Sequence, residues 1–203
     1  MKRCLVEVYY LLSILVVATV PLCNHICVAT QDVNVSDCAT ETLPIVMVFN
    51  TSERLWYYEV NSTQAKNLST CIFFQKFNIT EKDYYSWQNE LYSERSKLSE
   101  PCHGTFRNST AGDLGAMSLA CGDPESSAIK EEFELKYTER NCSVFFVTVP
   151  SLHISWKPKQ PACRMYIPDN AVDNGPTPNC SYYFNTNCTG KPAVFYNETC
   201  RTL

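Results

Sequence analysis

Short stretches rich in β-branched and aromatic residues recur along most of this chain, with polar turn residues between them. In the clearest stretch, from Phe133 to Tyr137, apolar and charged residues alternate. This period of two is typical of a strand with one buried face and one wet face. Eight stretches predict strands: Arg54–Val60, Cys71–Phe77, Asp83–Tyr92, Cys102–Arg107, Ala116–Cys121, Glu132–Thr138, Cys142–Val149 and Cys163–Ile167.

Helix signals are confined to the two ends of this strand-rich region. One helix is expected in the region before Pro44, and another from Pro176 to Asn187, with Pro178 early in it. Eight short antiparallel strands with little helix between them predict an all-β fold, either a sandwich or a closed up-and-down barrel. Periodicity alone leaves both architectures open.

The N-terminus has the pattern of a secretory signal peptide. Lys2 and Arg3 precede an apolar run from Leu11 to Val20, and small residues follow near Ala29. The run is too short to span a bilayer. We therefore expect residues 1–29 to be a signal peptide, residues 30–203 to form a single domain, and the mature protein to be secreted and extracellular.

The charge of the expected mature chain excludes some partners. Removing residues 1–29 leaves 15 basic and 20 acidic side chains, a net charge of about −5. This mild acidity, with no dense basic patch, argues against nucleic acid or an anionic membrane as the partner.

Cysteine usage also fits export, because nine cysteines lie well beyond the signal and disulfides persist outside the cell. A metal site is not expected, since no C-x-x-C pair occurs and only His103 and His153 remain after processing. Nine is odd, so either one thiol is free or cleavage after Cys23 leaves Cys27 as a tenth cysteine. The nine are Cys38, Cys71, Cys102, Cys121, Cys142, Cys163, Cys180, Cys188 and Cys200.

Ten N-x-S/T sequons predict a glycoprotein. A glycosylated asparagine must face solvent and usually sits at a turn. The sequons are at Asn34, Asn50, Asn61, Asn67, Asn78, Asn108, Asn141, Asn179, Asn187 and Asn197.

The inventory of motifs argues against an enzyme. The chain has no G-x-S-x-G, no H-E-x-x-H and no glycine-rich phosphate loop, and its two mature histidines have no obvious carboxylate partner. No cofactor is expected, and a binding protein is the better hypothesis.

The C-terminal third holds several distinctive segments: Asn141 to Phe145, Ala162 to Tyr166, Asn170 to Pro176, and the cysteines Cys180, Cys188 and Cys200. Towards the front of the chain, Glu53 to Trp56 and Thr70 to Phe74 belong to the same pattern. In these segments the chain resembles the tick salivary lipocalins of the histamine-binding-protein family.

The resemblance implies an eight-stranded antiparallel up-and-down lipocalin barrel, with a short N-terminal helix near its open end and a C-terminal helix packed outside. It also implies two disulfides, Cys71–Cys200 and Cys142–Cys163, and gives no pairing for the other cysteines. Members of this family sequester host mediators, either amines such as histamine and serotonin or leukotrienes, thromboxane and fatty acids. Some related lipocalins instead bind complement components or immune-cell receptors through the barrel surface.

The chain departs from the family's amine-binding signature at two places. Ser143 stands where an aspartate is expected, and Arg164-Met165-Tyr166 stands where Glu-Leu-Trp or Glu-Leu-Tyr is expected. An inward Arg164 would repel an ammonium and suit a lipid carboxylate, whereas an outward one would simply face solvent.

An eight-stranded barrel has room for its own side chains or for one small ligand. Trp56, Tyr58, Phe73, Phe145 and Tyr166 are candidates for the cavity wall, with ordinary core packing as the alternative for each. Two acidic residues also lie on predicted strands. Glu134 should lie on the wet face of its strand. The face of Glu59 is ambiguous, because the residues around it do not alternate regularly between apolar and polar. The candidate ligand residues are therefore Trp56, Tyr58, Glu59, Phe73, Phe145, Arg164 and Tyr166.

The sequence thus predicts a secreted salivary protein that sequesters a small host mediator in its barrel, suppressing inflammation and haemostasis and so helping to evade the host response. A biogenic amine is the first expectation for the ligand. The alternatives are an apolar acid, such as an eicosanoid or fatty acid, and a protein partner on the barrel surface.

Overall fold

The computed structural model describes residues 42–62, 71–93, 96–109, 112–123, 129–150 and 161–203. The expected signal peptide lies outside these residues and remains a prediction, as does the domain boundary at residue 30. Cys38, Asn34, Asn67 and His153 also lie outside them.

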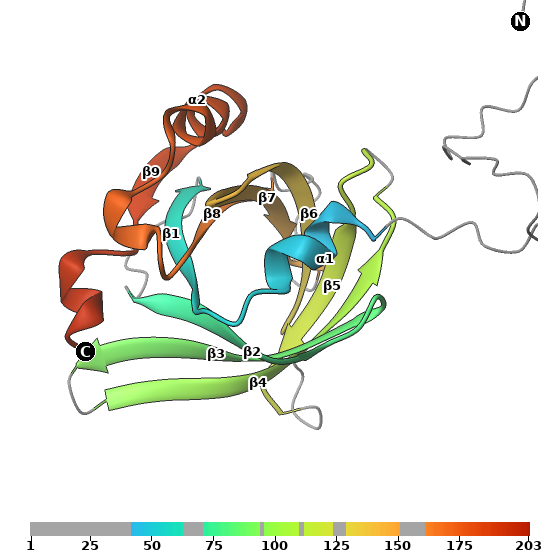
Figure 1. The fold of residues 1–203 in the computed structure, drawn as a ribbon, viewed down its shortest axis with the longest axis horizontal. Coiled ribbons are helices and arrows are strands. Elements are labelled where there is room, and N and C mark those ends of the chain that lie inside the picture. The colour runs from blue at the N-terminus through green and yellow to red at the C-terminus, as the bar shows by residue number, and fades with distance from the viewer. Residues whose placement is uncertain (1–41, 63–70, 94–95, 110–111, 124–128, 151–160) are drawn as a thin grey trace, which may run out of the picture. The chain divides into compact units, whose positions relative to one another are not determined.

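The described strands form one antiparallel sheet that closes into a barrel (Figure 1). Neighbours run in the order β2-β3-β4-β5-β6-β7-β8-β1, and β1 pairs back onto β2. All eight predicted strands are present, and the closed pairing makes the fold a barrel and not a sandwich. Their bounds are β1 Leu55–Ser62, β2 Ile72–Ile79, β3 Asp83–Ser93, β4 Ser96–Arg107, β5 Ala116–Cys121, β6 Ile129–Glu139, β7 Cys142–Thr148 and β8 Ala162–Pro168.

The seam between β1 and β2 is short, with Leu55 opposite Phe74 and Trp56 opposite Phe73. Beyond that point a further strand, β9 (Lys191–Val194), pairs with β1 from Glu59 to Ser62. The sequence analysis missed β9, because four mostly exposed residues with a proline carry no period-2 signal.

A short helix, α1 (Pro44–Phe49), covers the end of the barrel at which β1 begins, hereafter the α1 end (Figure 1). Proline at a first helical position has its φ angle already set and lacks only an N–H that would have no partner there. The helix therefore begins at Pro44, whereas the sequence analysis expected a helix that ends before this residue. Ile45 and Phe49 are fully buried, so α1 closes this end, contrary to the expectation that it lies near an open one.

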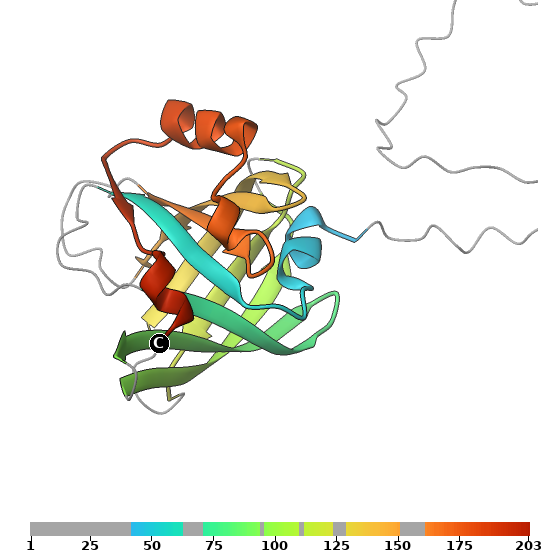
Figure 2. The ribbon, with the colours of Figure 1, turned by 60° about the vertical axis from the view of Figure 1, so that its left-hand side comes forward.

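The second helix, α2 (Pro178–Asn187), lies outside the barrel wall, as predicted (Figure 2). Thr177 caps its first turn by accepting a hydrogen bond from the Cys180 N–H at 3.3 Å. Two 3-10 turns, Val172–Asn174 and Glu198–Arg201, complete the C-terminal region. Among the described helices, none is long and apolar enough to cross a membrane.

Four disulfides join the described cysteines: Cys71–Cys200, Cys102–Cys121, Cys142–Cys180 and Cys163–Cys188. The first is the bond that the resemblance implied between the tail and the barrel wall.

The expected Cys142–Cys163 disulfide is wrong. Phe146 lies opposite Cys163, so Cys142 is four residues further along β7, a separation of about 13 Å at ~3.3 Å per residue. A disulfide requires the two Cα atoms to lie within about 7 Å. Cys188 follows Cys180 by eight positions, which span a similar length, about 12 Å, in a helix. The two disulfides therefore bond α2 to β7 near one end and to β8 at the other.

Most of the described sequons are exposed, but Asn61 is buried. Its side-chain nitrogen, where a glycan would be attached, donates a hydrogen bond to the Cys188 carbonyl at 3.1 Å. A buried amide cannot carry a sugar, so the structure contradicts glycosylation at Asn61. Asn141 is half-buried, and the exposed ones are Asn50, Asn78, Asn108, Asn179, Asn187 and Asn197. For these seven, glycosylation remains a prediction.

Candidate functional site

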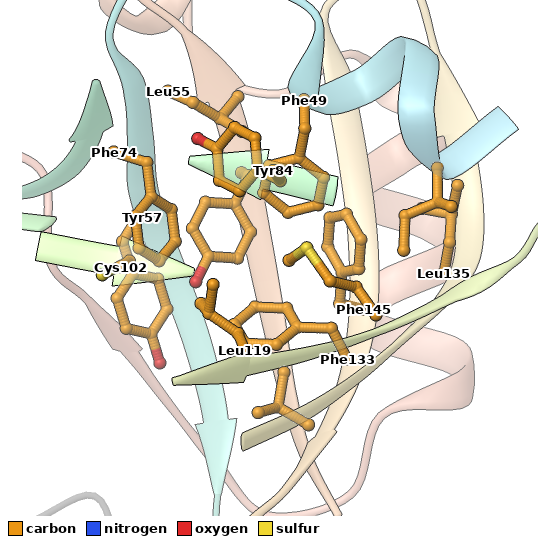
Figure 3. Packing of buried hydrophobic residues seen from close by; sticks show 14 of the residues in the cluster. Phe49, Leu55, Tyr57, Phe74, Tyr84, Cys102, Leu119, Phe133, Leu135 and Phe145 are labelled. Carbon is orange, nitrogen blue, oxygen red and sulfur yellow. The ribbon is translucent and has the colours of Figure 1, made fainter. Parts of the chain in front are cut away.

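The barrel interior near α1 is filled by aromatic side chains that meet around Phe49 (Figure 3). The Phe49 ring lies 4.8 Å from the ring of Tyr84 and 5.6 Å from that of Phe145, measured between centroids. Phe133 and Phe74 add edge-on contacts. These side chains occupy the interior at the α1 end, so we consider the opposite end of the barrel, hereafter the distal end, for a ligand site.

Three predicted ligand residues do point into the barrel. Phe145 and Tyr166 are buried in the inner cluster, with ring centroids 5.5 Å apart. Arg164 lies directly opposite Phe145 on the neighbouring strand and shares its inner face. Whether these side chains contact a ligand remains a prediction.

The remaining four candidates do not face the interior. They are Trp56, Tyr58 and Glu59 on β1, and Phe73 on β2. Trp56 and Phe73 are buried in a second cluster outside the barrel wall, with ring centroids 4.7 Å apart, and Tyr58 packs there against Tyr196. The reason is the C-terminal segment, which covers the outer face of β1 and gives it a hydrophobic core of its own. Because β1 carries aromatic residues on both faces, its sequence does not reveal which residues point inward. In the structure these are Leu55 and Tyr57.

Glu59 also lies on the outer face, because it is opposite Met165, a member of the outer cluster. Partial burial raises the pKa of its carboxyl group. Glu134 faces outward as predicted, and forms an ion pair with Lys136 at 2.8 Å. Burial alone would raise the pKa of Glu134, but hydrogen bonds from Lys136 and Ser109 lower it overall.

The central polar feature of the interior is an ion pair between Arg164 and Glu131. Two guanidinium nitrogens of Arg164 donate to the two Glu131 oxygens at 2.7 and 2.5 Å. The side chains are 17% and 18% exposed. Glu131 lies opposite Leu119, which belongs to the inner cluster, so the pair is inside the barrel.

Aromatic rings surround this ion pair. The Arg164 guanidinium lies 5.2 Å from the ring centroid of Tyr57 and 5.5 Å from that of Phe133. Burial alone would lower the pKa of Arg164, but the Glu131 carboxylate raises it, so the guanidinium stays charged. Burial also raises the pKa of Tyr57 to about 12 and that of Tyr166 further, so both phenols keep their protons.

Two further carboxylates lie on the inner face near the distal end. Glu100 is opposite Gln88, which is itself opposite the inward Phe74, and Glu90 is opposite Ile72, which packs against the inner cluster. Glu90 and Glu100 are diagonal neighbours on adjacent strands, a relation in which the residues are typically about 7–8 Å apart and their Cβ atoms somewhat closer. Among the described residues, the inner phases at the distal end thus carry these three carboxylates against two cations, Arg164 and the exposed Lys191, which shares the inward phase of Ala193 on β9.

The sequence analysis missed Glu131, although its phase was readable. Phe133 and Leu135 are the apolar, inward residues of β6, and Glu131 precedes Phe133 by two. A charged residue at a position where the alternation predicts a buried side chain was the signal that could have identified Glu131. Glu90 and Glu100 had no such signal, because their hairpin lacks a clean alternation.

A groove of about 580 Å³ opens at the α1 end, between α1, the start of β1 and the turn joining β6 to β7. Its walls include Met47 of α1, Glu53, Arg140 and Asn141. Neither Phe49 nor any of the inner carboxylates is among the residues that line it. A glycan at Asn141 would also fill it, so we do not assign the ligand site to this groove.

No family model and no curated protein matches this chain. Among solved structures, it is similar to Japanin from Rhipicephalus appendiculatus bound to cholesterol, with a TM-score of 0.51 and 11% identity over 74% of this chain and 96% of that one. It is also similar to lobster apocrustacyanin A1, with a TM-score of 0.47 and 10% identity over 77% of this chain and 85% of that one. The similarity to Japanin is one of fold, and the eight-stranded antiparallel closed barrel is the lipocalin fold.

Proposed function

We propose that this protein binds a small molecule on the distal inner face of its barrel, and that the preferred ligand is an aromatic or apolar amine. The observation that carries the proposal is that, within the described part of the barrel, the distal inner phases hold three carboxylates, Glu90, Glu100 and Glu131, against two cations, Arg164 and the exposed Lys191. These groups replace the acidic residues that the family signature would have at positions 143 and 164.

The chemistry fits an ammonium ligand. Two glutamates in diagonal register can approach one ammonium group from two sides and accept charge-assisted hydrogen bonds from it. The aromatic layer of Tyr57 and Tyr166 lies beneath, where it can pack against the apolar part of the ligand. The Arg164–Glu131 pair is neutral as a unit and therefore does not cancel the charge of the other two carboxylates.

A second candidate ligand is an apolar acid, because Arg164 does point inward. Its guanidinium could exchange the Glu131 carboxylate for that of a fatty acid or an eicosanoid. The cholesterol bound to Japanin is an apolar molecule, which makes an apolar ligand plausible for a barrel of this fold. The exchange is disfavoured here because the acid would approach Glu90 and Glu100.

Sequestration outside the cell is part of this proposal. Four disulfides in the described residues are typical of proteins from oxidising compartments. A protein that removes a mediator by holding it needs affinity and abundance and no turnover, which agrees with the absence of enzyme motifs. Secretion in saliva, and suppression of host inflammation and haemostasis, would follow from the sequence resemblance.

Isothermal titration calorimetry of the glycosylated protein with histamine, serotonin, a leukotriene and arachidonate tests the ligand class. We expect an amine to bind with micromolar or tighter affinity and the acids to bind more weakly. Binding of an acid alone would favour the second candidate, and binding of none of the four would contradict both.

Replacing one inner carboxylate provides a sharper test of the site. We expect Glu100→Gln to weaken amine binding about tenfold, or ~1.4 kcal/mol, because a charge-assisted hydrogen bond becomes a neutral one. Glu134→Gln is the matched control, since Glu134 lies on the outer face of the same barrel. Equal affinities for the two variants would show that the ammonium does not reach Glu100.

A further inference from the structure

An exposed aromatic surface lies on the outer face of β2 and β3, on the opposite side of the barrel wall from the inner carboxylates. Phe77 and Trp87 are 59% and 42% exposed. Their ring centroids are 6.3 Å apart, and the Phe77 ring lies 6.0 Å from that of Tyr85. We call Phe77, Tyr85 and Trp87 the outer aromatic face.

A β-bulge places a sequon asparagine on this same face. The register between β2 and β3 shifts between Lys76 and Asn78, and Asn78 lies opposite Tyr85. In a bulge, two residues of one strand oppose a single residue of the other. Phe77 and Asn78 therefore both face outward beside Tyr85, whereas strict alternation would have turned Asn78 into the barrel.

Polar groups border the aromatic rings. The His103 ring stacks on Tyr85 with a centroid distance of 4.7 Å and an interplanar angle of 9°, and its Nε2 lies 3.0 Å from an Asp83 oxygen. Both polar side chains are partly exposed, so their remaining hydrogen-bonding capacity faces the solvent over the rings.

We propose that the first sugars of an N-glycan on Asn78 pack against the outer aromatic face. The proposal rests on the predicted export of the chain and is independent of the ligand inside the barrel. A pyranose ring has an apolar C–H face that suits an aromatic ring, and hydroxyl groups that suit a histidine and an aspartate. Asn78 is exposed, and its sequon, Asn78-Ile79-Thr80, is complete.

The covalent tether is the reason to assign this surface to the glycan and not to a partner protein. A sugar attached to Asn78 begins beside Tyr85 and Phe77, so its effective concentration at the rings exceeds that of any free partner. The backbone N–H of Ile79 donates to the Asn78 side-chain oxygen at 2.9 Å, which limits the directions in which the attached sugar can leave the turn.

A double-mutant cycle on protein secreted from eukaryotic cells tests the contact. Asn78→Gln removes the glycan, and Trp87→Ala removes an exposed ring. We expect each change alone to lower the melting temperature by about 2–4 °C, as a loss of ~1 kcal/mol does in a domain of this size. In the double variant we expect no further loss, because either change alone already breaks the contact. Thr80 is left in place, since its hydroxyl accepts a hydrogen bond from the Asp83 N–H.

Asn108→Gln is the matched control, because it removes another exposed sequon from a different strand end. Its effect should simply add to that of Trp87→Ala. Additive effects in the Asn78 cycle as well, or a glycopeptide mass spectrum showing Asn78 unoccupied, would overturn the proposal. Nuclear Overhauser contacts between the N-acetyl methyl group of the first sugar and the Trp87 ring would support it directly, and their absence in the occupied protein would also overturn it.

Discussion

Phe49→Ala is expected to lower the free energy of unfolding by about 4 kcal/mol. Phe49 is fully buried, and its ring contacts those of Phe74, Tyr84 and Phe145 in the interior near α1. Removing the ring leaves a cavity that these rigid neighbours cannot fill, and it detaches α1 from the barrel end. Chemical denaturation followed by circular dichroism measures the loss.

Met47→Ala is the control for this change, because Met47 lies on the same short helix and is 64% exposed. Its effect should stay within about 0.5 kcal/mol. If Phe49→Ala were as mild as Met47→Ala, the interior would not be packed around α1. The proposed restriction of the ligand to the distal end would then lose its basis.

Glu131→Gln is expected to lower the free energy of unfolding by about 3 kcal/mol, because it leaves the charge of Arg164 largely buried without its partner. The guanidinium cannot release its proton to relieve the cost, since arginine stays charged in proteins. The measurement is again denaturant unfolding, without ligand.

Two further variants separate charge from packing. Glu132→Gln removes a carboxylate one residue away on the outer face, where its ion pair with Arg107 is more exposed, and should cost less than about 1 kcal/mol. Replacing both members of the inner pair by apolar residues, Glu131→Leu together with Arg164→Met, should restore most of the lost stability. If Glu131→Gln lowered the free energy of unfolding only slightly, water would reach Arg164 freely. The distal interior would then be open and wet.

Much of the fold was predictable because the strands carry local signals. Alternation in Phe133 to Tyr137 and dense apolar residues in Val144 to Val147 each identify a strand without knowledge of its neighbours. Closure into a barrel could not be predicted from the periodicity of the strands, since the strands of a sandwich have the same pattern. The resemblance to lipocalins decided between them, and the pairing of β1 with β2 confirms the barrel.

The candidate site was only partly predictable, and the errors have one physical origin. β1 and β8 are covered outside by the C-terminal segment, so both faces of each strand are apolar and the inward phase is ambiguous. Trp56 on β1 was therefore assigned to the wrong face, as was Phe73 on β2, which belongs to the same outer cluster. Tyr166 was assigned to the right face, and the face of Arg164 was left open. The disulfide error is related, because the strand register that separates Cys142 from Cys163 is a property of the assembled sheet.

The crystal structure of the glycosylated protein with serotonin tests the central claim most directly. We expect the ligand on the distal inner face, above Tyr57 and Tyr166, with its amino nitrogen within about 2.7–3.2 Å of a Glu90 or Glu100 oxygen. Serotonin in the groove beside α1, or on the outside of the barrel, would contradict the account.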